Sequence, residues 1–198
     1  MKKILNYLFE HKSLSRVQAK EVLHNISNNV YSDAEIAAFI TVYLMRSITI
    51  EELQGFRDAL MELCVPVDLN GKDLIDIVGT GGDGKNTFNI STLSCFIVAG
   101  TGTKVAKHGN YGASSMSGSS NVMEQLGYTF KKDSDALNNE LDEANICFLH
   151  APLFHPALKV VGPIRKNLGV RTFFNMLGPM VNPASPKYQL VGVYNLEM

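Results

Sequence analysis

Glycine is unevenly distributed along the chain, and this constrains the fold more than any other feature of the sequence. Residues 1–70 contain one of the 16 glycines, Gly55, whereas residues 71–127 contain eleven of them. Glycine is needed where the backbone adopts a positive φ or must approach a ligand closely. We therefore expect a separate helical unit in the first third and a small-molecule site in the middle third.

The composition excludes several classes of protein. The 198 residues carry 18 basic and 19 acidic side chains, so the net charge of −1 gives no general attraction to nucleic acid or anionic lipid. No window reaches the roughly 18 uninterrupted apolar residues of a membrane helix, and the N-terminus lacks the apolar region of a signal peptide. Cys64, Cys95 and Cys147 fit neither a disulfide framework nor a metal knuckle. We expect a cytoplasmic protein that binds neither nucleic acid nor membrane.

The first 70 residues carry three helix-start signatures. Each is a capping box followed by apolar residues at helical spacing: Ser15 with Gln18, Ser32 with Glu35, and Thr49 with Glu52. With a first helix near residues 3–11, they predict four short helices. Four helices of about three turns bury little apolar surface, so we expect them to dock on a larger unit or on a second copy of themselves. Pro66 disfavours helix at Val65, and we place a hinge there.

From Leu74 onward, short apolar runs alternate with helical segments. The expected strands are Leu74–Val78, Thr103–Lys107, Ile146–Leu149 and Tyr188–Tyr194. The expected helices are Ile90–Gly100, Ser119–Leu126 and Ser134–Ala144. This alternation predicts a mostly parallel sheet flanked by helices, with ligands at the carboxyl ends of its strands. The fold class is therefore α/β, with a small helical domain over residues 1–70 and a larger, incomplete α/β domain over residues 71–198.

The first glycine-rich loop covers residues 79–92. Its glycines let successive backbone N–H groups converge on an anion at the start of the next helix. The spacing of Gly79, Gly81 and Gly84 imitates a dinucleotide-binding fingerprint, but no acidic residue ends the next strand to hold a ribose hydroxyl. A P-loop match fails at Asn86, where Ser or Thr should hold Mg²⁺.

The second glycine-rich loop covers residues 107–120, after the next strand. Lys107 can neutralise phosphate, and the run Ser117–Ser119 begins a helix directed at the loop. His108, judged by residue type, is more often a structural hydrogen-bonding group than a catalyst, and we find no nucleophile–base–orienter triad around it. Two consecutive strand ends with such loops predict a ligand with two separated phosphate groups.

Longer motifs in fixed order resemble those of a known family. They are GTGGDG at residues 79–84, TFNIST at 87–92, KHGN at 107–110, SS at 114–115, SGS at 117–119, HPA at 155–157, and the run from Arg165 to Pro183 with LG, RT, FN, LGP and NP. In register over the whole chain, they resemble anthranilate phosphoribosyltransferases. The resemblance implies an enzyme of tryptophan biosynthesis that transfers phosphoribose from 5-phosphoribosyl 1-diphosphate (PRPP) to the amine of anthranilate and releases pyrophosphate, with Mg²⁺ as cofactor. It also implies a homodimer.

The resemblance assigns roles by matched position. Because carbocation character develops at the ribose C1, it implies no catalytic nucleophile; the protein positions two substrates and stabilises the departing diphosphate. PRPP contacts would come from Gly79, Gly82, Asp83, Thr87, Asn89, Ile90, Ser91, Thr92, Lys107, His108, Gly109, Asn110, Tyr111, Gly112, Ala113, Ser114, Ser115 and Ser119. Ser91 would also be a Mg²⁺ ligand. Gly79, Asn110 and Arg165 would bind anthranilate, with Arg165 facing its carboxylate.

Three departures from the family pattern stand out. Tyr111 replaces the usual Arg, and Asn121 stands where Asp is common, which we interpret as a mild change in helix capping. The family's paired Asp-Glu motif, which holds Mg²⁺, lies downstream of residue 198, and the acidic pair Asp142-Glu143 is expected to face solvent on a helix. We therefore expect little transferase activity from these residues alone, and an exposed sheet edge and apolar face.

Two other functions stay open. One is a pyrimidine nucleoside phosphorylase-like enzyme of a related fold; Arg165 and the GTGGDG loop argue against it. The other is a non-catalytic fragment that folds and dimerises through residues 1–70.

Overall fold

The computed structural model describes residues 1–81, 87–112, 116–193 and 195. Packing divides the chain into two compact units, one formed by Met1–Cys64 with His155–Leu177 and the other by Val65–Phe154 with Gly178–Met198. The chain therefore returns to the helical unit for a segment that we expected in the α/β domain. The domain boundary at residue 70 stays a prediction.

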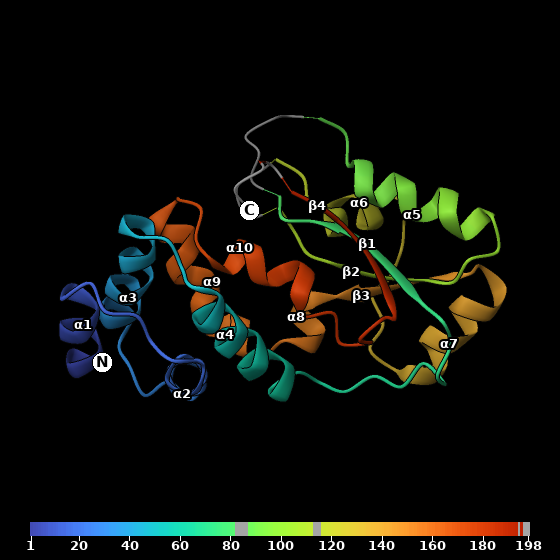
Figure 1. The fold of residues 1–198 in the computed structure, drawn as a ribbon. Coiled ribbons are helices and arrows are strands. Elements are labelled where there is room, and N and C mark those ends of the chain that lie inside the picture. Colours follow the sequence, from blue (N-terminus) through green and yellow to red (C-terminus); the bar gives the residue numbers. More distant parts are fainter. Residues whose placement is uncertain (82–86, 113–115, 194, 196–198) are drawn as a thin grey trace. The chain divides into compact units, whose positions relative to one another are not determined.

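The helical unit contains six helices within the described residues: α1 (Lys2–Phe9), α2 (Arg16–Ser27), α3 (Asp33–Met45), α4 (Ile50–Glu62), α9 (Ala157–Leu168) and α10 (Phe174–Leu177) (Figure 1). All three predicted capping boxes are present, with Ser15, Ser32 and Thr49 as N-caps. Gly55 is the one glycine of residues 1–70, and α4 lies against α2 there: a Cβ at Gly55 would be 2.2 Å from the Arg16 carbonyl oxygen. Four short helices thus begin where the sequence predicts them.

An aromatic cluster forms the core of the helical unit. Phe39, Tyr43 and Phe56 lie against Phe173, whose ring stacks on Phe56 with centroids 4.7 Å apart and on Phe174 at 4.4 Å. α9 packs on α2 and α3, and α10 packs on α4. Three of the four N-terminal helices, α2, α3 and α4, therefore pack against a segment from later in the same chain, and α1 packs on α3.

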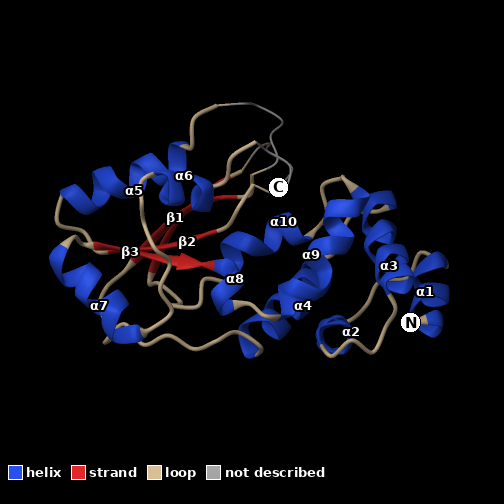
Figure 2. Cartoon of the chain, turned by 180° about the vertical axis from the view of Figure 1, so that it is seen from behind, coloured by secondary structure: helices blue, strands red, loops and turns tan. Residues whose placement is uncertain are grey.

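The α/β unit contains a four-stranded, all-parallel sheet in the order β3-β2-β1-β4. Its elements are β1 (Ile75–Gly79), α5 (Ile90–Gly100), β2 (Val105–Gly109), α6 (Ser119–Gln125), α7 (Ser134–Glu143), β3 (Ile146–His150), α8 (Ala151–Phe154), the 3₁₀ turn Gly178–Met180 and β4 (Tyr188–Gly192). Figure 2 shows helices on both sides of these strands. The predicted class, a helical domain and an α/β domain with a parallel sheet, is confirmed.

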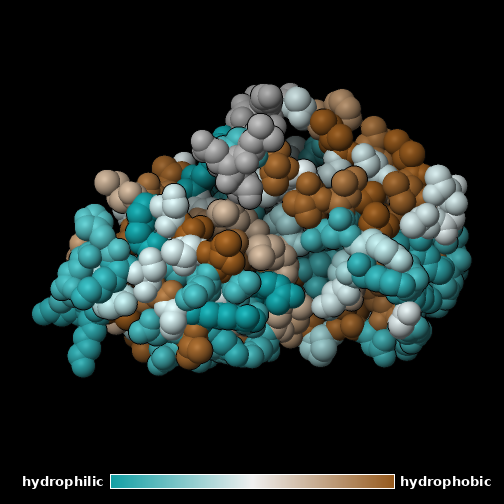
Figure 3. Space-filling model, viewed as in Figure 1, coloured by the Kyte–Doolittle hydropathy of each residue, from teal (hydrophilic) through white to brown (hydrophobic). Residues whose placement is uncertain are grey.

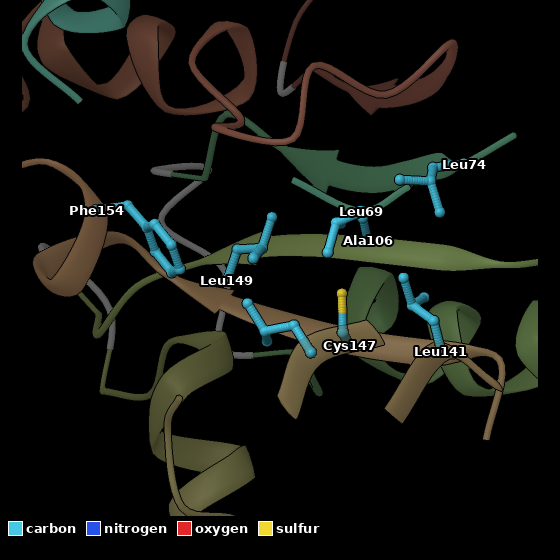
Figure 4. Packing of buried hydrophobic residues seen from close by; sticks show 8 residues of the cluster. Leu69, Leu74, Ala106, Leu141, Cys147, Leu149 and Phe154 are labelled. Atoms are coloured by element: carbon cyan, nitrogen blue, oxygen red, sulfur yellow. The ribbon is translucent and has the colours of Figure 1, made fainter. Parts of the chain in front are cut away.

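Alternate strand residues build two cores, one on each face of the sheet. On one face, Ala106, Cys147 and Leu149 pack with Leu141 of α7 and with Phe154 (Figure 4). On the other face, Ile77 and Val105 pack with Cys95 and Ala99 of α5. Because successive side chains of a strand point to opposite faces, these two clusters fix which helix covers which face.

Backbone pairing is uneven across the sheet. β1 pairs with β4 at every position from Ile75–Tyr188 to Gly79–Gly192, and β2 pairs with β3 from Val105–Ile146 to Gly109–His150. Between β1 and β2, all of whose residues are described, Ile75–Val105 is the one registered pair. β1 and β2 are thus parallel neighbours in register at Ile75–Val105, between two strand pairs that are aligned over five residues each.

The edge strand and one helix expose apolar surface, as we expected. Within the described residues β4 pairs on one side only, and each of its residues is exposed. On α5, Ile90, Leu93 and Ile97 are 57%, 50% and 61% exposed, and Figure 3 shows the resulting hydrophobic surface over this helix. None of the described helices is long and apolar enough to cross a membrane.

Candidate functional site

Two glycine-rich loops begin at neighbouring strand ends. β1 ends at Gly79 and β2 at Gly109, and the loops that follow lead into α5 and α6. Because β1 and β2 are parallel neighbours, both loops start from the carboxyl edge of the sheet, where α/β folds bind ligands (Figure 1). The Asn89 Nδ2 atom donates to the Ser117 carbonyl oxygen at 3.2 Å and so joins the two loops.

The first loop ends at the N-terminus of α5. Gly82 and Asp83, both predicted to contact PRPP, lie outside the described residues; Thr87 and Ile90 are exposed and Ser91 is half-buried. Thr92, in the first turn of α5, is 2% exposed, and its hydroxyl has no hydrogen-bond partner among the described residues. A buried hydroxyl of this kind, beside the N–H groups of a helix N-terminus, fits an oxygen-rich anion.

The second loop is fastened to the start of α6 by one amide side chain. The Asn121 Oδ1 atom accepts hydrogen bonds from the Gly112 N–H at 3.1 Å and from the Gly118 N–H at 2.9 Å. The backbone N–H of Ser120 and the Ser119 hydroxyl donate to the Asn110 carbonyl at 3.1 and 3.4 Å. Asn121 therefore closes both ends of the segment that contains Ala113, Ser114 and Ser115, which are outside the described residues.

Two glycines of this loop are required by close packing. A Cβ at Gly118 would lie 2.3–2.5 Å from backbone atoms of Asn110, Tyr111 and Gly112. A Cβ at Gly109 would lie 2.3 Å from the Ser119 hydroxyl and 2.5 Å from the Phe148 ring. The backbone around Gly118 cannot yield to such contacts, and at Gly109 the Ser119 and Phe148 side chains would have to shift, so the shape of the second loop depends on glycine at these positions.

Tyr111, the residue that replaces the family's usual Arg, points to α6. Its hydroxyl donates to Glu124 Oε1 at 2.5 Å, and this hydrogen bond raises the pKa of the phenol. Its ring meets the His150 ring edge-on at 5.0 Å, and Phe130 stacks on the same imidazole at 4.0 Å. Burial lowers the pKa of His150. The Tyr111 hydroxyl is thus hydrogen-bonded to a carboxylate of α6, and its assignment to PRPP stays a prediction.

Lys107 and His108 lie within the sheet. The Lys107 side chain is 2% exposed, and its Nζ atom donates to the Ile77 carbonyl at 2.9 Å. His108 is buried, with Nδ1 3.1 Å from the Gly178 carbonyl oxygen. Direct contact of Lys107 with phosphate stays a prediction, because its ammonium group has a protein partner here.

A buried carboxylate lies between these strands. Asp76 is fully buried, and its Oδ1 atom accepts from the backbone N–H of His108 at 3.3 Å. Burial raises the pKa of Asp76, opposed by a hydrogen bond with Asn182 and by the positive charge of Lys107. We did not single out Asp76 from the sequence, although one charged residue inside the apolar run from Leu74 to Val78 is a recognisable signal.

Arg165 lies on α9, in the helical unit, whereas Gly79 and Asn110 belong to the α/β unit. Its Nη2 atom donates to Asn175 Oδ1 at 3.0 Å, and its guanidinium lies 5.3 Å from the centre of the Phe174 ring. Burial lowers the pKa of Arg165, and its buried Nε atom has no partner among the described residues. Its side-chain hydrogen-bond partner is the neutral Asn175 amide, so the guanidinium can bind an anionic ligand.

The described residues hold no group of three His, Cys, Asp or Glu side chains that could bind a metal ion. The acidic pair Asp142-Glu143 was expected to face solvent. Asp142 is exposed, and it forms ion pairs with Lys72 and Lys104. Mg²⁺ is commonly held by one or two protein oxygens together with substrate phosphates. The hydroxyls of Ser91 and Thr92 at the start of α5 fit that kind of site, in which the ligand supplies most of the oxygens.

Two family models match the chain. One, described as glycosyl transferase family, a/b domain, matches residues 71–198, and the other, glycosyl transferase family, helical bundle domain, matches residues 2–64. An anthranilate phosphoribosyltransferase of Christiangramia forsetii is 65% identical over all 198 residues, which cover 60% of that protein. The chain thus spans about three fifths of the length of the curated relatives that it matches.

Solved structures agree with this match. The anthranilate phosphoribosyltransferase of Thermus thermophilus superposes with a TM-score of 0.87 at 36% identity, over 98% of this chain and 59% of that one. The Saccharomyces cerevisiae enzyme in complex with PRPP and Mg superposes with a TM-score of 0.83 at 32% identity, over 93% and 55% of the two chains. Since helical and a/b models follow one another in the order of the helices and the sheet, the chain belongs to this glycosyl transferase family.

Proposed function

We propose that the chain forms part of an anthranilate phosphoribosyltransferase, which transfers phosphoribose from PRPP to anthranilate and releases pyrophosphate. The observation that carries this proposal is the pair of glycine loops at adjacent parallel strand ends, joined by the hydrogen bond from Asn89 to Ser117. Two separated anion sites suit PRPP, which carries a phosphate and a diphosphate. The names of the relatives favour this reaction over the nucleoside phosphorylase alternative.

In this proposal, the loops bind PRPP and the chain needs no covalent nucleophile. The N-terminus of α5 and the loop N–H groups face the phosphate groups and stabilise the charge that grows on the departing diphosphate. The described members of the assigned set that lie in these loops or begin the helices after them are Gly79, Thr87, Asn89, Ile90, Ser91, Thr92, Gly109, Asn110, Tyr111, Gly112 and Ser119. Ser91 contributes one oxygen to Mg²⁺, and that ion, when bound, neutralises diphosphate charge.

Arg165 is assigned to the anthranilate carboxylate. Its guanidinium is held by Asn175 and lies over Phe174, so its direction is set before a ligand arrives. A planar carboxylate accepts two parallel hydrogen bonds from such a fork, and burial strengthens them. The homodimer and the cytoplasmic location implied by the family are likewise carried forward as proposals.

The test of the proposal is PRPP binding, measured by calorimetry in the presence of Mg²⁺. Gly118→Ala places a methyl group against backbone atoms of the second loop, so we expect at least about a tenfold weaker PRPP affinity, equal to about 1.4 kcal/mol. Gly100→Ala is the matched control, because a Cβ there meets nothing within 4 Å, and its affinity should equal that of the wild type.

Three results would count against the proposal. The wild-type chain showing no heat with millimolar PRPP would refute binding, and equal affinities for Gly118→Ala and wild type would remove the second loop from the site. Turnover of phosphate with thymidine or uridine would favour the phosphorylase instead. For the 198 residues alone, we expect little loss of anthranilate fluorescence with PRPP and Mg²⁺, because the family's paired Asp-Glu motif is not among them.

A further inference from the structure

His150 is the last residue of β3, and its imidazole lies beside the second loop. In the sheet it is aligned with Gly109, the residue that ends β2 and precedes the rest of this loop. The other residues of β3, Ile146–Leu149, are apolar, and His150 itself is 5% exposed. A polar side chain that is buried in this way needs a hydrogen-bond partner, and His150 has one in α6.

That hydrogen bond connects β3 to the end of the second loop. The Oγ atom of Ser120, in the first turn of α6, lies 2.8 Å from His150 Nδ1, and Ser120 is 0% exposed. The backbone N–H of the same serine donates to the Asn110 carbonyl at 3.1 Å. Ser120 therefore joins three parts of the site, namely the first residues of the loop, the start of α6 and the carboxyl end of β3. Because water is excluded there, the hydrogen bond is stronger than it would be at the surface.

Two aromatic rings fix the orientation of the imidazole. The Phe130 ring stacks on it with centres 4.0 Å apart and 8° between the planes, and the Tyr111 ring meets it edge-on at 5.0 Å. Phe130 in turn lies 5.4 Å from the Phe148 ring of β3. The imidazole cannot turn away from Ser120 without losing these contacts. His150 thus contacts the second loop near its start, at Tyr111, and just after its end, at Ser120.

We propose that His150 is a positioning residue of the second loop, which fixes the start of α6 through the Ser120 hydroxyl and so holds the loop in the shape that binds an anionic group of the ligand. This inference rests on the proposed function, in which the loop binds PRPP. The contacts with PRPP come from loop residues such as Asn110, and His150 acts through Ser120 rather than on the ligand. Groups that bind a ligand keep their geometry, to within about 0.5 Å, only when the hydrogen bonds behind them are in place.

His150→Phe tests the hydrogen bond separately from the ring. The phenyl group keeps a ring beside Phe130 and Tyr111 but removes Nδ1, which leaves the buried Ser120 hydroxyl without this partner. We expect PRPP affinity, measured by calorimetry with Mg²⁺, to fall at least about tenfold. Ser120→Ala removes the other half of the same hydrogen bond at the cost of one oxygen atom, and it should weaken PRPP binding to a similar extent. His150→Asn, whose amide group reaches the position of Nδ1, should restore the affinity to within about threefold of the wild type.

The double variant Ser120→Ala/His150→Phe separates positioning from a purely structural role. Each single variant leaves one buried polar group unpaired and should lower the midpoint of urea denaturation, whereas the double variant removes both groups and should recover that midpoint. If His150 only stabilised the fold, PRPP affinity would recover together with the midpoint. In the positioning role the hydrogen bond is absent from all three variants, so the double variant should bind PRPP as weakly as the single variants do.

Asn138→Ala is the matched control. Asn138, on α7, is 6% exposed and donates to the carbonyl oxygens of Asp68 and Ser134, each at 3.0 Å, outside both loops. This variant should also lower the midpoint of urea denaturation, but its PRPP affinity should equal that of the wild type. A loss of PRPP affinity as large as that in His150→Phe would show that affinity follows stability, and the inference would be wrong.

Three further results would overturn the inference: unchanged PRPP affinity in Ser120→Ala or His150→Phe, recovery of affinity in the double variant, or binding by His150→Asn that is as weak as that by His150→Phe. Should His150→Phe fail to fold, Ser120→Ala decides the question, because it removes the same hydrogen bond with the smaller change in packing. A wild-type chain that binds no PRPP would contradict the proposed function instead.

Discussion

Two buried carboxylates lie in the described part of the chain, and their surroundings differ. Glu52, in the helical unit, is 0% exposed and accepts hydrogen bonds from the Leu14 and Thr49 N–H groups, each at 2.9 Å, from the Tyr43 hydroxyl at 3.2 Å and from the Arg46 guanidinium. Asp76, in the α/β unit, is equally buried and is hydrogen-bonded to Asn182, while the His108 N–H and the Gln189 amide lie 3.3 and 3.4 Å from its oxygens. The first carboxylate has an arginine partner and several short hydrogen bonds, whereas the second has two long hydrogen bonds besides that with Asn182.

The pKa values follow this difference. Burial by itself would raise the pKa of Glu52, but hydrogen bonds from Arg46, Thr49 and Leu14 outweigh it, and the pKa is lowered. At Asp76 the effect of burial is larger than that of the hydrogen bonds and of Lys107, and the pKa is raised. The hydrogen bonds of Glu52, in the helical unit, thus compensate for the cost of burying its charge. Those of Asp76, at the base of the candidate ligand site, compensate for only part of that cost.

The largest expected effect is on stability, through Glu52. Glu52→Ala leaves Arg46 half-buried without its partner and removes the acceptor that joins the start of α2 to α3 and α4. We expect the free energy of unfolding at neutral pH to fall by about 3–5 kcal/mol, as measured by urea denaturation. Glu51→Ala, one residue away on the exposed side of α4, is the control and should change it by less than about 0.5 kcal/mol.

The same variant tests the contrast between the two carboxylates. Glu52→Ala, studied where it is still folded, should leave PRPP affinity unchanged, because the residue belongs to the helical unit. A loss of PRPP affinity of about tenfold or more in this variant would show that the two carboxylates do not have separate roles.

Lowering the pH should change the contributions of Glu52 and Asp76 to the free energy of unfolding in opposite directions. A carboxyl with a lowered folded pKa stabilises the fold above its unfolded value, 4.5 for Glu52, and this stabilisation is lost as pH falls through the lower folded pKa. For Asp76, whose folded pKa lies above its unfolded 3.8, the penalty of the charged form is present at neutral pH and is relieved as pH falls through the folded pKa.

We therefore expect Glu52→Gln to lose less stability than wild type below about pH 4.5, and Asp76→Asn to lose more than wild type over the acid range. Urea denaturation at about pH 7, 5 and 3.5 measures both differences. Parallel curves for wild type and Glu52→Gln would contradict the assignment of Glu52.

Local sequence signals predicted most of the helices and strands. The features that they did not predict depend on contacts between residues far apart in the sequence. The capping boxes at Ser15, Ser32 and Thr49 located three helices because both partners of each box lie within four residues. The four strands were located by apolar runs that end in glycine or polar loops. By contrast, α9 (Ala157–Leu168) was not predicted, because Gly162 and Pro163 interrupt its helical pattern.

The candidate site shows the same division. Glycine spacing was enough to place the two loops, since backbone that must pack closely, as at Gly118, excludes other residues. The partners of Lys107 could not be predicted, because its bond to Ile77 joins residues 30 positions apart on neighbouring strands. The return of residues 155–177 to the helical unit could not be predicted either, since it depends on contacts between residues far apart in the sequence, such as those of Phe173 with Phe39, Tyr43 and Phe56.

The smallest effect is expected at Tyr111, on the loop side of the comparison. Its ring is 41% exposed, so the bond from its hydroxyl to Glu124 forms in contact with water and is worth less than about 1 kcal/mol. Tyr111→Phe keeps the ring against His150 and should lower PRPP affinity by less than about fivefold. Tyr128→Phe, which removes a similar bond to Glu140 away from the loops, is the control.

Tyr111→Arg places a cation beside Glu124 and should bind PRPP at least as tightly as the wild type, because an ion pair can replace the hydrogen bond. A tenfold or larger loss in Tyr111→Phe but not in Tyr128→Phe would show that the hydroxyl itself contacts the ligand, and the second loop would then depend on Tyr111 as well as on its glycines.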